Sequence, residues 1–197
     1  MDFERLQKQF DFILEMDKEK QVLRQTHIHG YERQETDAEH AWHMALMTML
    51  LSEYANEEID VLHTIEMLLI HDLVEVDAGD TYAYDDAGNA SKAEREQAAA
   101  DRIYGLLPED QGKRLRALWD EFEAGKTPEA KFAHVMDNIQ PMMLNAANDG
   151  RDWKRHGVHV AQVLKRNEHT SEGSEILWNY AREHYIQPNI HSGNLMQ

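Results

Sequence analysis

Apolar side chains recur at the spacing of an α-helix along most of this chain. Near the start, five of them fall on one face of a helix: Phe3, Leu6, Phe10, Ile13 and Leu14. After a polar, irregular segment over 17–35, the stretch TDAEHAWHMALMTMLLSEYA repeats the pattern. Its Thr36 and Glu39 stand in capping-box positions, so we predict a second helix that runs to about Tyr54.

The third predicted helix starts at a cap on Asp60 and runs through Leu69 to about Val76. Its end is unusual, because the sequence LLIHDLVEVDAGD passes directly from apolar residues to a histidine and several acids. Ionised carboxylates are almost never buried unless they are paired or hold a metal. The next segment, residues 81–90, is predicted to be a loop whose length and Tyr and Asp content suit a functional loop or a lid.

The second half of the chain gives the same helical pattern. Helix starts are signalled by capping pairs or proline: Ser91 with Glu94, Pro108, and Thr127 with Pro128. Gly125 should end the second of these helices, and Pro141 should kink the third just after Asp137 and Asn138. Two more helices are expected near 157–168 and 173–186, followed by a loose tail.

Composition supports one all-α domain. The 197 residues are 42% hydrophobic, which suits a single core. Gly numbers 10 and Pro only 4, and β-branched runs are scarce. We therefore predict one helical domain over residues 1–187 and a tail over 188–197.

Charge and cysteine content exclude several functions. The formal net charge of −17 argues against nucleic acid or an anionic membrane as a partner, but a bound metal would still allow a phosphorylated small molecule. The absence of cysteine excludes disulfides, thiolate zinc sites and cysteine nucleophiles. Residues 1–20 lack the apolar core of a signal peptide, and no segment approaches about 18 uninterrupted apolar residues, so we expect a cytoplasmic protein.

Polar side chains in apolar helical surroundings predict a metal site. His40 lies one turn into the second helix, the pair His71 and Asp72 ends the third, and Asp137 lies within FAHVMDNIQPM. Three separate helices can bring such side chains together inside a bundle. Each residue alone has a plainer interpretation: His40 as a satisfied core histidine, Asp137 as a helix-surface residue.

Two imidazoles and two carboxylates suit Mn, Fe(II), Co, Mg or Zn. Four protein ligands leave two positions of a six-coordinate ion open, one for water and one for a phosphoryl oxygen. Glu75 stands four residues after His71, on the same helical face. It is therefore a candidate general base or positioner for the attacking water.

These residues carry a family resemblance. The E-H at 39–40, H-D-x-x-E at 71–75, G-D at 79–80 and D at 137 resemble the motif of the HD-domain metal-dependent phosphohydrolases. The resemblance is strongest to the small, single-domain branch that contains the 5′-deoxynucleotidases, and it covers residues from about 20 to 170.

The resemblance implies an HD-type helical bundle that binds one divalent ion through His40, His71, Asp72 and Asp137. It places Glu75 and Asp80 next to the water and the substrate. It also implies substrate contacts from Arg33, seven residues before His40, and from Arg24. The nucleotidases have a tryptophan beside the latter arginine, whereas this chain has Gln25, a departure that bears on substrate preference. For Arg33 an ordinary surface ion pair is the alternative.

Our interpretation is a phosphomonoesterase for a nucleoside 5′-monophosphate or a similar small metabolite, and we expect a homodimer. Two alternatives remain: a non-catalytic nucleotide sensor on the same scaffold, and a dinuclear iron oxygenase. The oxygenase would need further histidines before Asp137, and residues 73–136 contain only His134. His43 is expected to support the site or simply to pack, and His134 to have a structural or supporting role.

Overall fold

The structure, a computed structural model, describes residues 3–84 and 91–197. Its longer helices are α1 (Phe3–Met16), α2 (Asp37–Leu51), α3 (Val61–Ile70), α6 (Lys92–Tyr104), α7 (Glu109–Ala124) and α8 (Pro128–Ala147). The shorter ones are α4 (Glu75–Ala78), α9 (Arg151–His156), α10 (Val160–Arg166), α11 (Thr170–Gly173), α12 (Glu175–Ala181) and α13 (Gln187–His191). Single turns η1 (Asp17–Gln21), η2 (Ser52–Tyr54) and η3 (Arg182–Ile186) complete the helical part.

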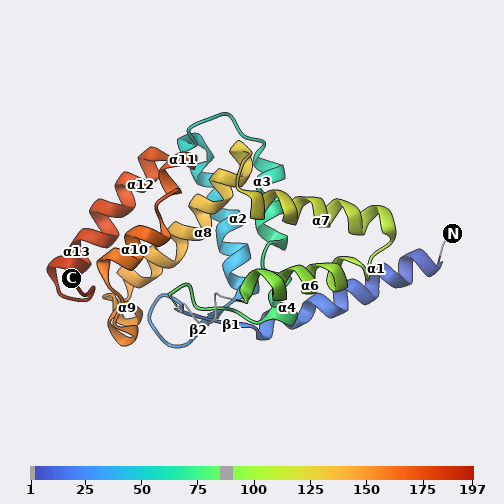
Figure 1. The fold of residues 1–197 in the computed structure, drawn as a ribbon, viewed down its shortest axis with the longest axis horizontal. Coiled ribbons are helices and arrows are strands. Elements are labelled where there is room, and N and C mark those ends of the chain that lie inside the picture. Colours follow the sequence, from blue (N-terminus) through green and yellow to red (C-terminus); the bar gives the residue numbers. More distant parts are fainter. Residues whose placement is uncertain (1–2, 85–90) are drawn as a thin grey trace.

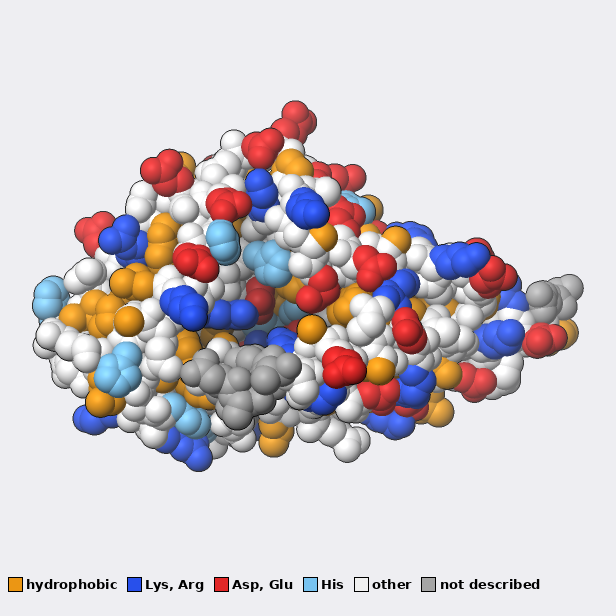
Figure 2. Space-filling model, viewed as in Figure 1, with side chains coloured by type: hydrophobic (Ala, Val, Ile, Leu, Met, Phe, Trp, Pro, Cys, Tyr) orange, Lys and Arg blue, Asp and Glu red, His pale blue; other side chains and the backbone are white. Residues whose placement is uncertain are grey.

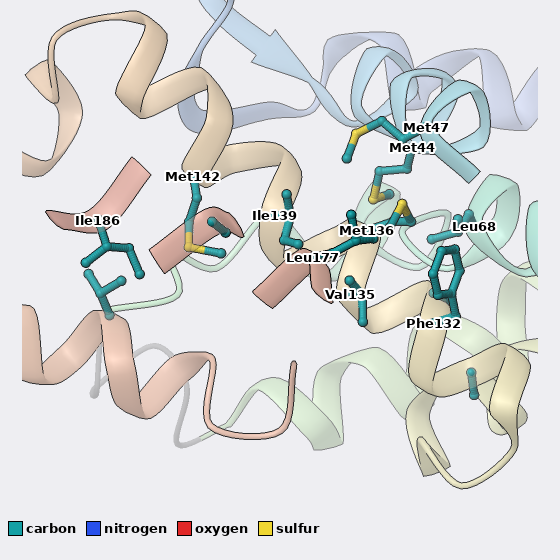
Figure 3. Packing of buried hydrophobic residues seen from close by; sticks show 14 of the residues in the cluster. Met44, Met47, Leu68, Phe132, Val135, Met136, Ile139, Met142, Leu177 and Ile186 are labelled. Carbon is teal, nitrogen blue, oxygen red and sulfur yellow. The ribbon is translucent and has the colours of Figure 1, made fainter. Parts of the chain in front are cut away.

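Helix α8 is the axis of the bundle (Figure 1). It packs against α2, α3, α7, α11 and α12. Its buried face packs against methionines of α2 and against Leu68 of α3 (Figure 3). The core residues labelled there are Met44, Met47, Leu68, Phe132, Val135, Met136, Ile139, Met142, Leu177 and Ile186. A second apolar cluster lies beneath α1, α4, α6 and α7: Phe12, Leu73, Val74, Ala99, Ala100, Ile103, Tyr104 and Trp119. The all-α prediction is confirmed. None of the helices in the described ranges is both long and apolar enough to cross a membrane.

Three of the sequence-derived caps form as expected. Thr36 and Glu39 make the capping box of α2, and Asp60 accepts a hydrogen bond from the backbone of His63 at the start of α3. Thr127 caps α8, with Pro128 in its first turn. Helix α6 begins after Ser91 as predicted, but the predicted capping box does not form, because the Ser91 side chain makes no capping hydrogen bond.

The segment over 17–35 is more ordered than its polar sequence indicated. It contains an antiparallel hairpin, β1 (Leu23–His27) and β2 (Gln34–Thr36), which pairs Leu23 with Thr36. The loop of the hairpin is tied to the far end of α8, where Asn148 bonds the backbone of His27, Ile28 and Gly30. The hairpin therefore lies beside α8 and α9 instead of forming a free loop.

The last ten residues are docked at several points, which differs from the expected loose tail, although most of their side chains are exposed. Leu195 is only 2% exposed, and Asn189 is buried and bonds the backbone of Tyr185. Met196 pairs with the backbone of Val158 and Val160. The burial of Leu195 and the backbone hydrogen bonds of Met196 dock the C-terminal segment at the start of α10. Of the predicted loop over 81–90, residues 85–90 lie outside the described part of the chain.

Candidate metal centre

The chain breaks its helix at the point where the apolar run ends. Helix α3 stops at Ile70, residues 71–74 form turns, and α4 begins at Glu75. The predicted single helix to Val76 is therefore divided in two. His71 and Asp72 lie directly after this end of α3, close to His40 on α2.

The four expected ligands come together there from three elements. Ligand atoms of His40, His71 and Asp72 lie within 4.8 Å of one another. Asp137, on α8, approaches this group through its Oδ1, which is 3.1 Å from Nε2 of His40. His40, His71 and Asp137 are buried, and the side chain of Asp72 is 13% exposed. The group thus lies at the inner wall of a cleft and not on the surface.

Each imidazole is oriented by a partner on its outer nitrogen. Nδ1 of His71 is 2.8 Å from the carbonyl of Leu68, and Nδ1 of His40 is 2.9 Å from Oε1 of Gln140. Both partners are acceptors, so both Nδ1 atoms carry the hydrogen and both Nε2 atoms face the carboxylates. Nε2 of His71 lies 3.0 Å from Asp72 yet makes no hydrogen bond within the described residues. A buried nitrogen in that state, beside carboxylates, fits a divalent ion.

The two histidines differ in their charge preference without a metal. Burial lowers the pKa of His40 to about 4, an effect that Arg24 reinforces. Burial acts in the same direction on His71, but the Asp72 carboxylate outweighs it and raises that pKa to about 9. Binding of a cation must therefore displace a proton from His71, and metal affinity should fall in acid.

A second group contains only carboxylates. Ligand oxygens of Asp37, Glu75 and Asp80 lie within 4.8 Å of one another. Burial, followed by the charge of Asp72, raises the pKa of Glu75 to about 11 and that of Asp37 to about 7. Burial also raises the pKa of Asp80. The group is destabilised when all three members are ionised and no cation is near.

Arg24 joins the two groups. Its Nη1 donates to Oδ1 of Asp37 at 3.0 Å and to Oδ2 of Asp72 at 2.7 Å. The side chain is only 15% exposed. The antiparallel register of the hairpin brings Arg24 back beside the start of α2, since Leu23 pairs with Thr36. A buried guanidinium at this place lowers the cost of holding the acids together.

Both groups open into one cleft. Its walls include Arg24, Asp72, Glu75, Asp80, Tyr82, Tyr84, Lys92, Asp137, Trp153, Arg166 and Asn167. Figure 2 shows acidic, basic and histidine side chains gathered around a hollow near the middle of one face. Polar groups thus surround one end of the cleft, whereas tyrosine and tryptophan rings line another part of it.

The structure does not bring Arg33 into the cleft. Its side chain is 53% exposed and donates to Glu39 at 2.7 Å, on the outside of α2. This is the surface ion pair that was the alternative interpretation, so the expected substrate contact from Arg33 is not supported. His134 bonds the carbonyl of Phe122 and stacks on its ring, which is a structural position.

Several residues beside the site gave no sequence signal. Gln140 bridges His40 to Glu35, since its Nε2 donates to Oε1 of that buried acid at 2.6 Å. The same Nε2 lies 3.1 Å from Nδ1 of His43, so His43 is linked to His40 through Gln140. Asp37 appeared to be an ordinary acid in the first turn of a helix, although it is fully buried. The acid-rich start of α2 was the available clue for Asp37, and none was available for Gln140.

Comparison with known proteins decides the family. A model of the family described as HD domain matches residues 16–178. The chain belongs to the HD domain family. It is similar to human "5'-deoxynucleotidase HDDC2", with 33% identity over 116 residues that cover 59% of this chain and 55% of the relative. A fission-yeast relative, "5'-deoxynucleotidase hdd1" of Schizosaccharomyces pombe, is 28% identical over 57% of each chain. The chain thus spans about half the length of the curated relatives it matches.

A solved structure resembles this HD domain over nearly its whole length. It is a predicted metal-dependent phosphohydrolase from Magnetospirillum magnetotacticum MS-1, 45% identical, with a TM-score of 0.93. The match covers 98% of this chain and 96% of that protein. The helical HD fold inferred from the motif is therefore confirmed.

Proposed function

We propose that this HD domain is a metal-dependent phosphomonoesterase that acts on a nucleoside 5′-monophosphate or a similar small phosphorylated metabolite. The observation that carries the proposal is the convergence of His40, His71, Asp72 and Asp137, in which Nε2 of His71 makes no hydrogen bond within the described residues, beside a second acidic group in the same cleft. The names of the relatives, 5'-deoxynucleotidase and metal-dependent phosphohydrolase, support it.

His40, His71, Asp72 and Asp137 would hold one divalent ion. When bound, that ion supplies a Lewis acid for the phosphoryl group and the attacking water. The identity of the metal is left open among Mn, Co, Fe, Mg and Zn, because imidazole with carboxylate suits all of them. Glu75 and Asp80 stay free of this group and can act on the water.

Glu75 is the best-placed base. It is 3% exposed, lines the cleft, and its Oε2 has no hydrogen-bond partner in the described part of the chain. The positive charge of a bound ion would lower the raised pKa of Glu75 and leave the carboxylate ionised. It can then accept the proton of the attacking water while the bond between phosphorus and the ester oxygen breaks. The proton then leaves on the alcohol product. Arg24, held between Asp37 and Asp72, faces the charge that develops on the phosphoryl oxygens.

The test is phosphate release from a panel of nucleoside monophosphates and sugar phosphates. The protein is stripped of metal and reloaded in turn with Mn, Co, Mg, Zn or Fe(II). Metal-dependent release is the expected result, and the compound that releases phosphate fastest identifies the preferred substrate. Tight nucleotide binding without any release under all five metals would favour a nucleotide sensor instead.

The structure offers no support for the oxygenase alternative. His134 would have to coordinate a second iron, but its Nε2 is hydrogen-bonded to the backbone carbonyl of Phe122. One metal ion per chain by elemental analysis is the expected stoichiometry for the iron-loaded protein.

We also propose a homodimer in the cytoplasm. One outward stripe of α2 carries Trp42, Leu46, Met49 and Leu50, which are 40% to 66% exposed. Four large apolar side chains on one helical face favour burial against a second copy. A charge placed there by Leu50→Glu should convert a dimer to a monomer in sedimentation experiments, while Ile176→Glu on α12 serves as a control. A wild-type monomer at all concentrations would contradict the proposal.

A further inference from the structure

One of the cations that line the cleft is less engaged by the nearby acids than the others. Three cations line the cleft among the described residues: Arg24, Lys92 and Arg166. Arg24 is engaged by Asp37 and Asp72, and the Nζ of Lys92 lies 3.3 Å from Glu96. Arg166 differs from both, because its side chain is 45% exposed and its contact is a long one.

That contact is to a proposed metal ligand. Nη2 of Arg166 lies 3.4 Å from Oδ2 of Asp137, whose other oxygen, Oδ1, faces His40 at 3.1 Å. The Asp137 carboxylate therefore stands between the imidazole group and the guanidinium. A guanidinium has five N–H donors, so one long contact leaves most of these donors available to another acceptor.

The position of Arg166 is fixed by the end of its helix. Arg166 is the last residue of α10, and the next residue, Asn167, is 2% exposed. Asn167 holds this turn, since its Nδ2 donates to the carbonyl of Val163 at 2.8 Å. The base of the Arg166 side chain is thus anchored, while its guanidinium reaches into the cleft.

Metal binding alone does not account for a cation here. A positive charge beside a ligand carboxylate repels a divalent ion and lowers its affinity. An anion held between the ion and the guanidinium is attracted by both, and phosphate oxygens match the planar arginine fork. The arrangement therefore favours an anionic ligand in this part of the cleft.

We propose that Arg166 binds the phosphoryl group of the substrate and stabilises its charge during transfer. The proposal rests on the phosphomonoesterase function given above and adds a residue to it. The phosphoryl group would lie between Arg166 and the ion, with two of its oxygens available to the guanidinium. Arg166 would then contribute to catalysis as well as to binding, since charge on these oxygens is redistributed as the ester bond breaks.

The test compares Arg166→Gln with Lys165→Gln, which removes a charge from the exposed neighbouring position on the same helix. Binding of Mn(II) and of inorganic phosphate to the Mn-loaded protein is measured by calorimetry. In Arg166→Gln, phosphate binding should weaken roughly 10- to 100-fold, whereas Mn(II) should bind as tightly as in the wild type or more tightly. The variant's kcat/KM should fall about 100-fold. Lys165→Gln should match the wild type in all three measurements.

Two outcomes would overturn the proposal. One is unchanged phosphate affinity in Arg166→Gln, and the other is a parallel loss of Mn(II) and phosphate affinity, which indicates a structural role. Arg166→Lys gives an independent variant that keeps the charge without the fork, and it should bind phosphate with intermediate affinity. If the wild type binds phosphate through Arg166 but releases none from any substrate, the anion site stands and the proposed function fails.

Discussion

The two acid groups of the cleft differ in how their charge is balanced before any ion arrives. The group of His40, His71, Asp72 and Asp137 combines imidazoles with carboxylates. Despite burial, the charge of His71 lowers the pKa of Asp72, and the hydrogen bond from His40 lowers the pKa of Asp137. In the group of Asp37, Glu75 and Asp80, carboxylates face one another and their pKa values are raised. The first group is thus arranged to hold a cation, and the second to take up protons.

The largest expected effect follows from removing one of the two carboxylates of the first group. Asp72→Ala should abolish stoichiometric metal binding and lower turnover at least about 1,000-fold, because it deletes a ligand and the partner of His71. Elemental analysis, phosphate release and circular dichroism measure the three consequences. Asp77→Ala, which loses an ion pair to Arg102 on the surface, is the matched control. A metal-replete, active Asp72→Ala protein would show that the site lies elsewhere.

The second group should affect turnover without determining metal content. In Glu75→Gln the base is lost but the ligands remain, so kcat should fall about 100- to 10,000-fold while one ion per chain is retained. Turnover numbers and metal analysis on the same sample test this separation. Loss of the ion in Glu75→Gln would contradict the prediction that the second group affects turnover without determining metal content.

A smaller effect is expected from the residue that orients His40. Gln140→Leu removes the acceptor for Nδ1 of His40 and frees its ring, which should weaken metal affinity roughly 10- to 100-fold. Competition with a chelator of known affinity measures the change. Gln140→Glu keeps an acceptor at that position and should lose less. Equal affinities for the wild type and Gln140→Leu would mean that packing alone fixes the imidazole.

A last effect is expected in the metal-free protein, where the free energy of unfolding should depend on pH. The folded-state pKa of Glu75, raised to about 11 by burial and the nearby acids, lies above its unfolded value. The stability that this group contributes is therefore present at low pH and is lost as pH rises above the unfolded pKa. Glu75→Gln cannot ionise, so its advantage in unfolding free energy over the wild type should grow between about pH 5.5 and about pH 8.5, by on the order of 1 kcal/mol per pH unit.

Urea unfolding with chelator present measures that difference. Glu66→Gln, which alters an exposed carboxylate paired with Arg114, should show no such trend. A constant difference between Glu75→Gln and the wild type at all pH values would contradict the raised pKa.

The sequence predicted what depends on helical periodicity and on local motifs. His40, His71, Asp72 and Asp137 stood out because each is polar in apolar surroundings, and the caps at Thr36 and Thr127 are signals within four residues. The same reasoning could not predict which residues distant in the sequence lie close together in the fold. The resemblance implied substrate contacts from both Arg24 and Arg33, yet the hairpin brings only Arg24 of these two to the site and leaves Arg33 paired with Glu39 outside it. Likewise, Gln140 and Arg166 matter through partners that are far away in sequence.

The separation between His40 and Asp137, 97 residues along the chain, has a consequence for synthesis. The ribosome releases α2 long before α8, so a nascent chain carries His40 without its partners. A centre that needs both helices is completed only after α8 has emerged and packed. All four ligands for an ion are therefore available together only when the chain through α8 has emerged, so full metal affinity belongs to the late stages of folding.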